Sequence, residues 1–507
     1  MQNGITRRNF NKTCAAGILA LTAGGRLAAA QPTKQPNVLL ITTDQQRVDA
    51  MSAVGNQWAK TPHMDSIAAN GVYFRKSYCP YPLCSPSRSS LHTGRPPHEI
   101  GVDRNTVPIN PAITISGQVF KAAGYDTGYS GKWHMPETYP ADGIAGFEVL
   151  NKTSRNNKMA KDVDEATMNQ AIEFLKRKRD KPFYLVVSFI NPHDICLLAS
   201  ETSPLLDDLL KRYMPAEGAQ TPPMPDNFAM PAAAPESVAK RSSAHAQWDE
   251  NHWRRYRYGY FRMMEDVDRQ VGQVLETLRS AGQEDNTLIV FTSDHGEGLA
   301  CHHWTGKMMY FDDEAAVPLI VSWKGVTPAG RIDKDHLVTA LDVLPTICDY
   351  AGLTPPEKMR GESLRAVIEH PETPGHEFVA SEMPGTGGKR SFMVRTKQYK
   401  YMFFPDTPPS EMLLDLDADP LEMKNLAGQE AQVGQQAVAG ELERHRKLLA
   451  QWKELTEEAQ HPIDTTSQKR KKPKAAKAAV AKGGAEKKAP AKKPAAAGQA
   501  QGQGKDE

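Results

Sequence analysis

The residues with the greatest chemical potential in this sequence lie in one short stretch, Cys84–Arg95, which reads CSPSRSSLHTGR. A cysteine can act as a nucleophile, or as the precursor of one, in covalent catalysis. A lone cysteine beside a turn-forming proline such as Pro86 is more often a buried thiol with no chemical role. The residues that accompany Cys84, both nearby and elsewhere in the chain, decide between these two interpretations.

Other ionisable residues stand just past runs of the sequence that are continuously apolar. The runs, each with the residue of interest that follows it, are 37–43 with Asp44, 183–189 with His193, and 287–292 with Asp294. Short apolar runs without alternation are typical of parallel strands that are buried on both faces. Open α/β sheets bind their ligands just outside the carboxyl ends of the strands. These residues are therefore candidates for a common site.

Helical and strand patterns alternate around these runs. Helices are expected at 61–71, 89–93, 114–124, 163–179 and 256–281, a further strand at 127–130, and an irregular Pro/Ala-rich excursion at 214–238. After residue 370, short strands at 391–396, 399–404 and 412–416 precede a helix near 435–455. This order predicts an α/β fold with a mostly parallel sheet flanked by helices, followed by a small C-terminal antiparallel sheet.

The two ends of the chain differ in composition from its body. Residues 6–12, TRRNFNK, resemble the twin-arginine export signal, and Ala28–Ala30 offer a cleavage site before Gln31. The apolar run between them is too short for a stable membrane anchor. We therefore expect a signal peptide at 1–30, a catalytic domain at 31–370, a C-terminal subdomain at 371–460 and a disordered Lys/Ala/Pro-rich tail at 461–507. The mature chain is expected in the periplasm or outside the cell.

Charge and cysteine content exclude some classes of function. Gln468–Glu507 hold twelve Lys or Arg against three Asp or Glu, and the first thirty residues hold four basic residues and no acid. The formal charge of +2 for the whole chain therefore leaves −11 for residues 31–467. An acidic body argues against a nucleic acid partner. The six cysteines contain no C-x-x-C pair, so neither a zinc knuckle nor a disulfide framework is indicated.

Several separate segments together resemble the formylglycine-dependent (type I) sulfatases of the alkaline-phosphatase superfamily. The stretch at Cys84 matches the family signature C-x-P-x-R followed by T-G-R. The other matching segments are NVLLITTDQ at 37–45, GYDTGYSGKWH at 124–134, Pro192-His193, SDHGE at 293–297, WTGK at 304–307 and LDLDADPLEMKNL at 414–426. The resemblance implies an alkaline-phosphatase-like fold and hydrolysis of sulfate esters.

In this family a maturation enzyme oxidises the signature cysteine to formylglycine, whose hydrated aldehyde attacks sulfur. For this chain the resemblance implies that Cys84 is that residue. Arg88 and Lys132 would neutralise the nucleophile and the sulfate oxygens, and Lys307 would bind sulfate near the leaving group.

The resemblance also implies proton-transfer roles. His134 would accept the proton of the diol when sulfate is released, Asp294 would assist the first deprotonation, and His193 would protonate the departing alcohol. His302 lies five residues before Lys307, where relatives often have a histidine, and is a further catalytic candidate.

A divalent cation is implied by the same resemblance, held by Asp44, Gln45, Asp294 and His295 together with the modified Cys84. Oxygen-rich ligation favours calcium. Many relatives have Asp in place of Gln45 and Asn in place of His295. Because these differences lower the ligand charge and add a nitrogen donor, manganese and magnesium are alternatives.

Three functions remain open at the level of the sequence. The first is a sulfatase acting on a sulfated carbohydrate, or on an aryl or alkyl sulfate. The second is a phosphonate monoester or phosphodiester hydrolase, because such relatives share the Asp-Gln and Asp-His pairs; Ser85 and the segment Pro192-His193-Asp194 favour sulfate. The third is a sulfoglycan-binding protein without activity, against which stand intact candidates at every site position.

Overall fold

The computed structural model describes residues 35–135, 143–151, 158–200, 202–240, 245, 247–385, 389–405, 410–427, 436–457 and 461. All of them belong to a compact unit that spans Met1–Ile463. The expected signal peptide at 1–30 and, apart from His461, the expected tail at 461–507 lie outside the described residues.

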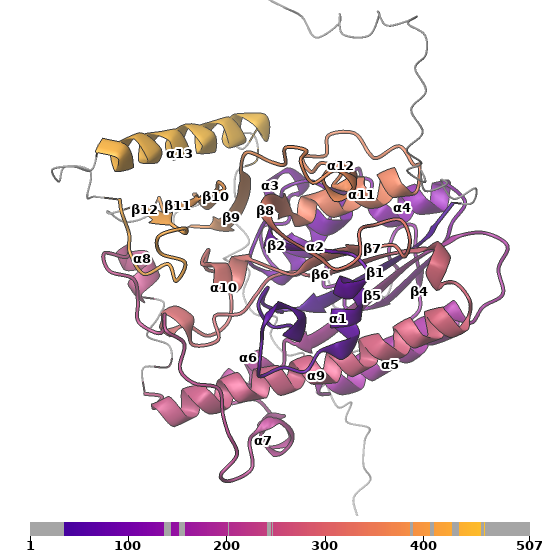
Figure 1. Ribbon diagram of the computed structural model, residues 1–507, viewed down its shortest axis with the longest axis horizontal. Coiled ribbons are helices and arrows are strands. Elements are labelled where there is room, and N and C mark those ends of the chain that lie inside the picture. The colour runs from indigo at the N-terminus through magenta and orange to yellow at the C-terminus, as the bar shows by residue number, and fades with distance from the viewer. Residues whose placement is uncertain are drawn as a thin grey trace, which may run out of the picture. The chain divides into compact units, whose positions relative to one another are not determined.

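An eight-stranded sheet forms the centre of the molecule (Figure 1). Its strands are β1 (Asn37–Asp44), β2 (Val72–Tyr78), β3 (Asp126–Gly131), β4 (Glu148–Val149), β5 (Phe183–Pro192), β6 (Thr287–Ser293), β7 (Leu319–Ser322) and β8 (Arg331–Thr339). They lie in the order β4-β3-β5-β1-β6-β7-β2-β8. Every neighbouring pair is parallel except the two that β7 forms with β6 and β2. The mostly parallel sheet expected from the sequence is confirmed.

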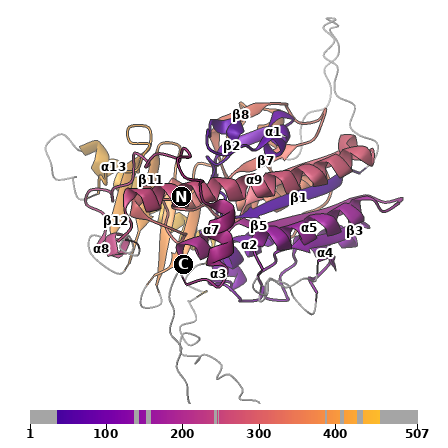
Figure 2. The ribbon, with the colours of Figure 1, turned by 90° about the horizontal axis from the view of Figure 1, so that it is seen from below.

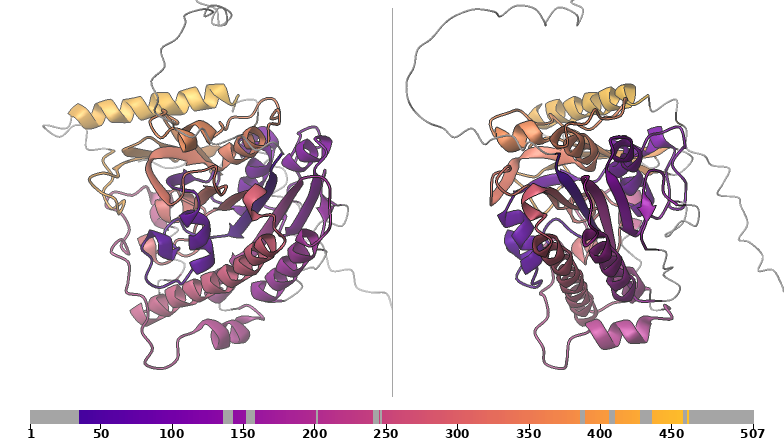
Figure 3. Two further views of the ribbon diagram at one scale, coloured as in Figure 1. Left: turned by 45° about the vertical axis from the view of Figure 1, so that its right-hand side comes forward. Right: turned by 90° about the vertical axis from the view of Figure 1, so that its right-hand side faces the viewer.

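Helices cover both faces of this sheet. The helices that contribute side chains to the core on either face include α1 (Pro62–Ala69), α2 (Cys84–Thr93), α4 (Ser116–Ala122), α5 (Ala160–Leu175), α9 (Glu250–Ser280), α11 (Val343–Tyr350) and α12 (Arg365–Glu369). Figures 2 and 3 show α5 and α9 side by side along one face. The shorter elements are α3 (Pro97–Ile100), α6 (Ile195–Ala199), α7 (Leu206–Tyr213), α8 (Glu236–Ala239), α10 (Asp312–Ala315), η1 (Ser52–Val54), η3 (Glu284–Asn286), η4 (Cys301–His303) and η5 (Ala340–Asp342).

The double cover explains why β1 is apolar without alternation. Leu39 and Ile41 belong to the core cluster that contains α1, α5 and α9. Val38 and Leu40 belong to the opposite cluster, which contains α2, α4, α11 and α12. Because side chains alternate between the faces of a strand, both faces must be apolar when both are covered.

A second, four-stranded sheet is entirely antiparallel, as expected. Its strands are β9 (Val379–Pro384), β10 (Arg390–Arg395), β11 (Tyr399–Phe403) and β12 (Glu411–Asp415), in the order β12-β11-β10-β9. Helix α13 (Gln436–Leu455) packs on one face through Leu442 and Trp452. The other face contributes Met393 and Met402 to a cluster that also contains Tyr310. Among the described residues, no helix has both the length and the apolar content needed to cross a membrane.

The register of the large sheet brings the predicted site residues to one edge. Strand β1 lies between β5 and β6, with Asp44 opposite Pro192 and Thr43 opposite Ser293. Consequently Asp44, His193 and Asp294 follow three adjacent strands at their carboxyl ends. The next strand, β3, ends at Gly131, opposite Ser188, and delivers Lys132 to the same edge.

Gly131 is the last residue of β3 and packs tightly against β5 at this edge of the sheet, so its replacement tests how closely the two strands must approach. Its φ is 108°, and a Cβ there would lie 2.0 Å from the carbonyl oxygen of Ser188. Gly124 also has a positive φ, of 89°, but a Cβ there meets nothing within 4 Å. We expect Gly124→Ala to cost about 1 kcal/mol of unfolding free energy, from backbone strain alone. Gly131→Ala should cost about 3 kcal/mol or more, because overpacking is added to strain. Urea unfolding of both variants measures the difference, and equal losses would contradict the packing argument.

Candidate active site

Cys84 is the first residue of α2, and its side chain is fully buried. Its Sγ lies 3.3 Å from His295 Nε2, 3.2 Å from Lys307 Nζ and 3.9 Å from Asp44 Oδ1. Burial and the Asp44 carboxylate raise the pKa of the thiol, but Lys132, Lys307 and His295 outweigh them and hold it well below its ordinary value. The position at a helix N-terminus acts in the same direction. The surroundings of Cys84 therefore stabilise negative charge at this position.

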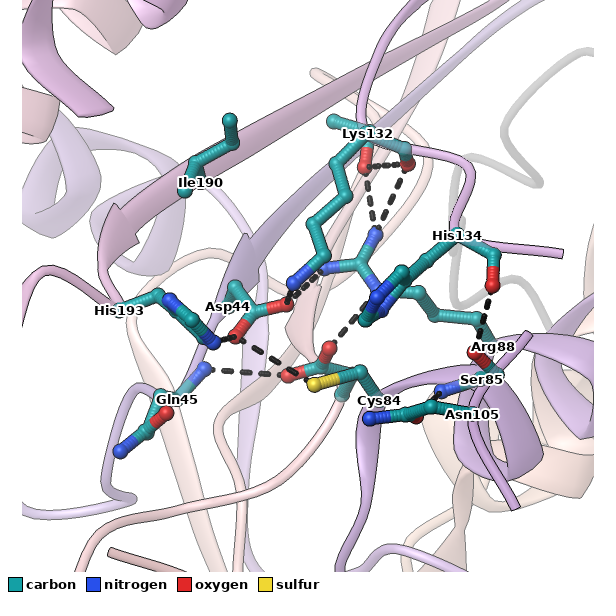
Figure 4. Close-up of polar contacts among 12 residues, drawn as sticks. Asp44, Gln45, Cys84, Ser85, Arg88, Asn105, Lys132, His134, Ile190 and His193 are labelled. Carbon is teal, nitrogen blue, oxygen red and sulfur yellow. Dashed lines mark hydrogen bonds and ion pairs between the residues drawn. The ribbon is translucent and has the colours of Figure 1, made fainter. Parts of the chain in front are cut away.

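Arg88 lies one helical turn after Cys84 and connects the strand ends (Figure 4). Its Nη2 donates to Asp44 Oδ2 at 2.9 Å, and its Nε donates to Asp294 Oδ2 at 2.7 Å. Its Nη1 donates to the Lys132 carbonyl at 3.1 Å and to Ser188 Oγ at 2.6 Å. Only 2% of the residue is exposed. One guanidinium therefore fixes groups from β1, β3, β5 and β6 relative to the helix that carries Cys84.

Four potential metal ligands converge beside this guanidinium. One ligand atom from each of Asp44, Cys84, Asp294 and His295 lies within 4.8 Å of every other. His295 Nδ1 lies 2.9 Å from the carbonyl oxygen of Gly296, which directs Nε2 toward the cluster. A ring held in this way by an outer hydrogen bond is the usual arrangement of a metal-binding histidine.

The two carboxylates of this cluster influence each other's ionisation. Burial raises the pKa of Asp44, but Lys132, His193 and Arg88 outweigh it and hold the pKa well below its usual range. Burial, together with the charge of Asp44, raises the pKa of Asp294 to about 6, although Arg88 opposes this. The shared Arg88 guanidinium thus does not fully compensate the two buried carboxylates, and a further cation beside them would favour the ionised form of Asp294. The donor set therefore fits a divalent cation.

Lys132 and His193 are two further neighbours of the Asp44 carboxylate. Lys132 Nζ lies 2.6 Å from Asp44 Oδ2, and His193 Nε2 lies 3.9 Å from Asp44 Oδ1. Burial lowers the pKa of His193 to about 3, helped by the positive charges of Lys132 and Lys307. The imidazole is therefore neutral near pH 7. An anion bound between these groups would raise its pKa, because negative charge favours the protonated ring.

His134 stands on the loop after β3, with a positive φ of 70°. Its carbonyl accepts a hydrogen bond of 2.6 Å from Ser85 Oγ, and the backbone N–H of Ser85 donates to Asn105 Oδ1 at 3.0 Å. Burial, followed by the charge of Lys132, lowers the pKa of the His134 ring. A neutral imidazole fixed beside Cys84 is suited to accept a proton.

The side chain of Gln45 contacts Lys307 and Glu297 rather than the four clustered metal-ligand candidates. Its Oε1 accepts from Lys307 Nζ at 3.0 Å, and its Nε2 donates to Glu297 Oε2. Only its backbone N–H reaches the cluster, donating to Asp294 Oδ1 at 3.0 Å. The structure thus brings Lys307 and Gln45 together beside Cys84, with the Gln45 amide toward the lysine.

His302 is the one predicted catalytic residue whose contacts lie elsewhere. Its ring stacks on Phe311 with centroids 3.8 Å apart, its Nδ1 is 3.4 Å from Asp313 Oδ2, and its Nε2 is 3.2 Å from the carbonyl of Leu421. Within the described part of the chain, these contacts link η4, α10 and the loop after β12. The spacing from Lys307 gave no information about this orientation.

Ser188 and Glu297, for which the sequence predicts no role, lie among the site residues in the structure. Ser188 accepts from Arg88 and donates to the Lys132 carbonyl at 2.8 Å. A serine inside the apolar strand β5 was the only signal for it. Glu297 lies within the segment 293–297 that resembled the family, but no pattern distinguished it from a surface acid.

Comparison with known proteins identifies what this arrangement resembles. Residues 36–353 match the family described as Sulfatase, and residues 300–450 match the C-terminal region of N-sulphoglucosamine sulphohydrolase. A Delta 4,5-hexuronate-2-O-sulfatase of Bacteroides thetaiotaomicron is 31% identical over 432 residues, which cover 79% of this chain and 86% of that protein.

Solved structures with a similar fold include a sulfatase and a phosphonate monoester hydrolase. A 2-O GAG sulfatase has a TM-score of 0.72 and 26% identity, covering 84% of this chain and 93% of its own. The phosphonate monoester hydrolase of Agrobacterium radiobacter has a TM-score of 0.67 and 25% identity, covering 82% and 96% respectively.

The Arg88 contacts predict a large loss of stability when the guanidinium is removed. Arg88→Met leaves Asp44 and Asp294 buried without their shared partner, which we expect to cost about 3–5 kcal/mol in the absence of added metal. Ser188→Ala removes only a neutral partner of the same guanidinium and should cost about 1–2 kcal/mol. Urea unfolding in a chelating buffer compares the two variants. A cost for Arg88→Met no larger than that for Ser188→Ala would show that the ion pairs do not hold this edge together.

Proposed function

The chain belongs to the sulfatase family of sulfuric ester hydrolases, and from this membership we propose that it removes sulfate from a sulfated carbohydrate, using a formylglycine at position 84 and a divalent cation. The observation that carries the proposal is the position of Cys84. Its side chain lies at the N-terminus of α2, within reach of Asp44, His295 and Lys307. A nucleophile here would meet an anionic ester among fixed positive charges.

The chemistry of this proposal requires oxidation of Cys84 by a formylglycine-generating maturation enzyme. The hydrated aldehyde would supply one hydroxyl to attack sulfur and a second whose deprotonation releases sulfate. A buried thiol among basic groups has no such second group. The role of the cationic neighbours of residue 84 is then to stabilise an oxyanion at this position.

The cation would be held by Asp44, Asp294 and His295 together with residue 84, and the Gln45 oxygen lies beside this cluster. When bound, it would act as a Lewis acid toward the nucleophile and the sulfate oxygens. Two carboxylates favour calcium, and the nitrogen of His295 keeps manganese and magnesium as alternatives.

Basic residues would bind the sulfate group. Lys132 and Arg88 lie on the Asp44 side of residue 84, and Lys307 lies on the Gln45 side. Negative charge that develops on the sulfuryl and leaving-group oxygens would be stabilised without reorganisation, because these cations are already fixed by hydrogen bonds.

Two histidines would move protons. The low pKa of His134 keeps its ring ready to accept the proton that leaves when sulfate is released. His193 would protonate the leaving alcohol once the bound sulfate has raised the pKa of its ring from about 3. Asp294, with a pKa raised to about 6, would assist the first deprotonation.

A carbohydrate substrate is supported by the relatives, which are named for sulfated hexuronate, N-acetylglucosamine and GAG substrates. Phosphonate monoester hydrolysis is the second candidate, because a phosphonate monoester hydrolase is a structural neighbour. Parallel assays on nitrophenyl sulfate and on a phenyl phosphonate ester would separate the two. Faster turnover of the phosphonate would reject the sulfatase proposal.

We also infer export in folded form to the periplasm or the cell exterior, from the motif at 6–12. Modification of Cys84 and loading of the cation would then precede export. The net negative charge of residues 31–467 argues against nucleic acid as a binding partner.

The formylglycine proposal is tested at Cys84. Active enzyme should yield a tryptic peptide whose mass is lower by the difference between –CH2SH and –CHO, and Cys84→Ala should abolish turnover. The matched control is Cys348→Ala, which removes a buried thiol on α11 and should retain turnover. Full activity from protein in which Cys84 is an unmodified thiol would reject the mechanism.

The role of His193 is tested by comparing leaving groups. A sugar hydroxyl is a poor leaving group that needs a proton, whereas nitrophenolate leaves readily. His193→Ala should therefore lower kcat for a sulfated sugar by about 10²-fold more than for nitrophenyl sulfate. His134→Ala is the contrast variant, because sulfate release is common to both substrates and both rates should fall together. Equal losses on both substrates in His193→Ala would leave His193 only a sulfate-binding role.

A further inference from the structure

Glu297 is a buried carboxylate to which the proposed chemistry gives no role. It follows His295 by two residues and has no exposed surface. Its Oε1 accepts hydrogen bonds from Tyr256 Oη at 2.8 Å, from the Gly306 N–H at 2.6 Å and from the Leu299 N–H at 3.2 Å. Its Oε2 accepts from the Gln45 amide. Every one of these donors is neutral, so the carboxylate is buried without a direct ion pair among its hydrogen bonds.

The Gln45 amide lies between Glu297 and Lys307. One end of the amide faces a carboxylate and the other faces an ammonium group that can only donate. Glu297 and Lys307 demand the same orientation, with Nε2 toward Glu297 and Oε1 toward Lys307. A third neighbour, Cys196 Sγ, lies 3.1 Å from Nε2 and 3.3 Å from Oε1 and is compatible with either orientation. Because Glu297 fixes the NH2 end of the amide, the amide oxygen faces Lys307 and accepts a hydrogen bond from its Nζ at 3.0 Å.

A second connection runs through the backbone. Gly306, whose N–H donates to Glu297, is the residue immediately before Lys307. The Gly306 carbonyl in turn accepts from the Gly298 N–H at 2.8 Å. Both the backbone and the amine of Lys307 are thus tied to one carboxylate, and Lys307 Nζ lies 3.2 Å from Cys84 Sγ.

We propose that Glu297 is a positioning residue for Lys307, setting the orientation of the Gln45 amide and the course of the loop at Gly306 so that the ammonium group faces residue 84. This rests on the proposed function, in which Lys307 binds the sulfate group. Glu297 itself touches no reacting atom.

The substitution Glu297→Gln tests the proposal with little change of shape. The three donors at Oε1 hold the new carbonyl oxygen in place, so the new NH2 group must face Gln45. Two NH2 groups cannot bond to each other, and the Gln45 amide turns over. Lys307 then faces an NH2 group and loses its Gln45 acceptor.

The measurement is a double-mutant cycle in kcat/KM for nitrophenyl sulfate, with metal-loaded full-length enzyme. We expect Glu297→Gln to lower kcat/KM about tenfold or more in the otherwise unchanged enzyme, as is usual when an outer hydrogen-bonding partner of a catalytic group is lost. In the Lys307→Ala background, which lacks the group to be positioned, the same substitution should cost less than about threefold.

Asp268→Asn is the matched control. Asp268 is also buried and accepts hydrogen bonds from backbone N–H groups, but it is on α9 and its donors, His63 and Met64, belong to α1. Its loss should lower the melting temperature and leave kcat/KM unchanged. If Glu297→Gln does not fold, Glu297→Asp replaces it, because it keeps the charge but is too short to reach both Gln45 and Gly306.

The outcomes separate this proposal from the one on which it rests. Equal losses from Glu297→Gln in both backgrounds, with Lys307→Ala itself impaired, overturn the positioning role alone. An unimpaired Lys307→Ala enzyme overturns the sulfate-binding role of Lys307 and the positioning role with it.

Discussion

The arrangement of the active site depends on the balance of buried charge around Arg88. Its guanidinium is shared by Asp44 and Asp294, two carboxylates at the ends of adjacent strands. Without it, two like charges would be buried a few ångströms apart, at a cost that packing cannot offset. Because Arg88 is one turn from Cys84 on α2, the same balance also fixes the helix that carries the candidate nucleophile.

The positive charges exceed what the two carboxylates need. Lys132 and Lys307 add to Arg88 within the same buried region. Their charges lower the pKa of Cys84 and of His193, so a negative group is favoured at position 84 and the imidazole is neutral. An anionic ester entering this region completes the charge balance. Its arrival also changes the protonation of the histidine that is proposed to act as the acid, which couples substrate binding to proton transfer.

The supports of the site are rigid because they are parts of the sheet and of its covering helices. Asp44, His193 and Asp294 stand at the ends of three adjacent strands; β1 pairs with β6 without a break and with β5 with one register shift between Thr42 and Asp44. The loop that carries Lys307 is not a strand, and the buried Glu297 carboxylate supplies the hydrogen bonds that a ladder would otherwise give. The backbone that precedes Lys307 is thereby hydrogen-bonded to a buried group.

The sequence by itself determined the fold class and predicted most of the residues that the structure brings together. Continuous apolar runs predicted β1, β5 and β6, because strands covered on both faces cannot alternate, and the residues after them proved to meet at one edge. It did not predict β2 or β7, and so did not predict that β7 runs antiparallel to its neighbours. Strand β7 has only four residues, β2 (VYFRKSY) contains no long continuous apolar run, and the pairing of both is decided by partners distant in the chain.

Tertiary structure alone decided which side chains face one another. His302 and Lys307 are five residues apart, yet the ring of His302 packs on Phe311 while Lys307 reaches Cys84. Ser188 and Glu297 are ordinary residues in the sequence and become partners of Arg88 and Gln45 only in the folded chain. Residue type and spacing limit what chemistry is available. The direction of most of these side chains depends on contacts between residues that are 100 or more positions apart, and local sequence does not encode those contacts.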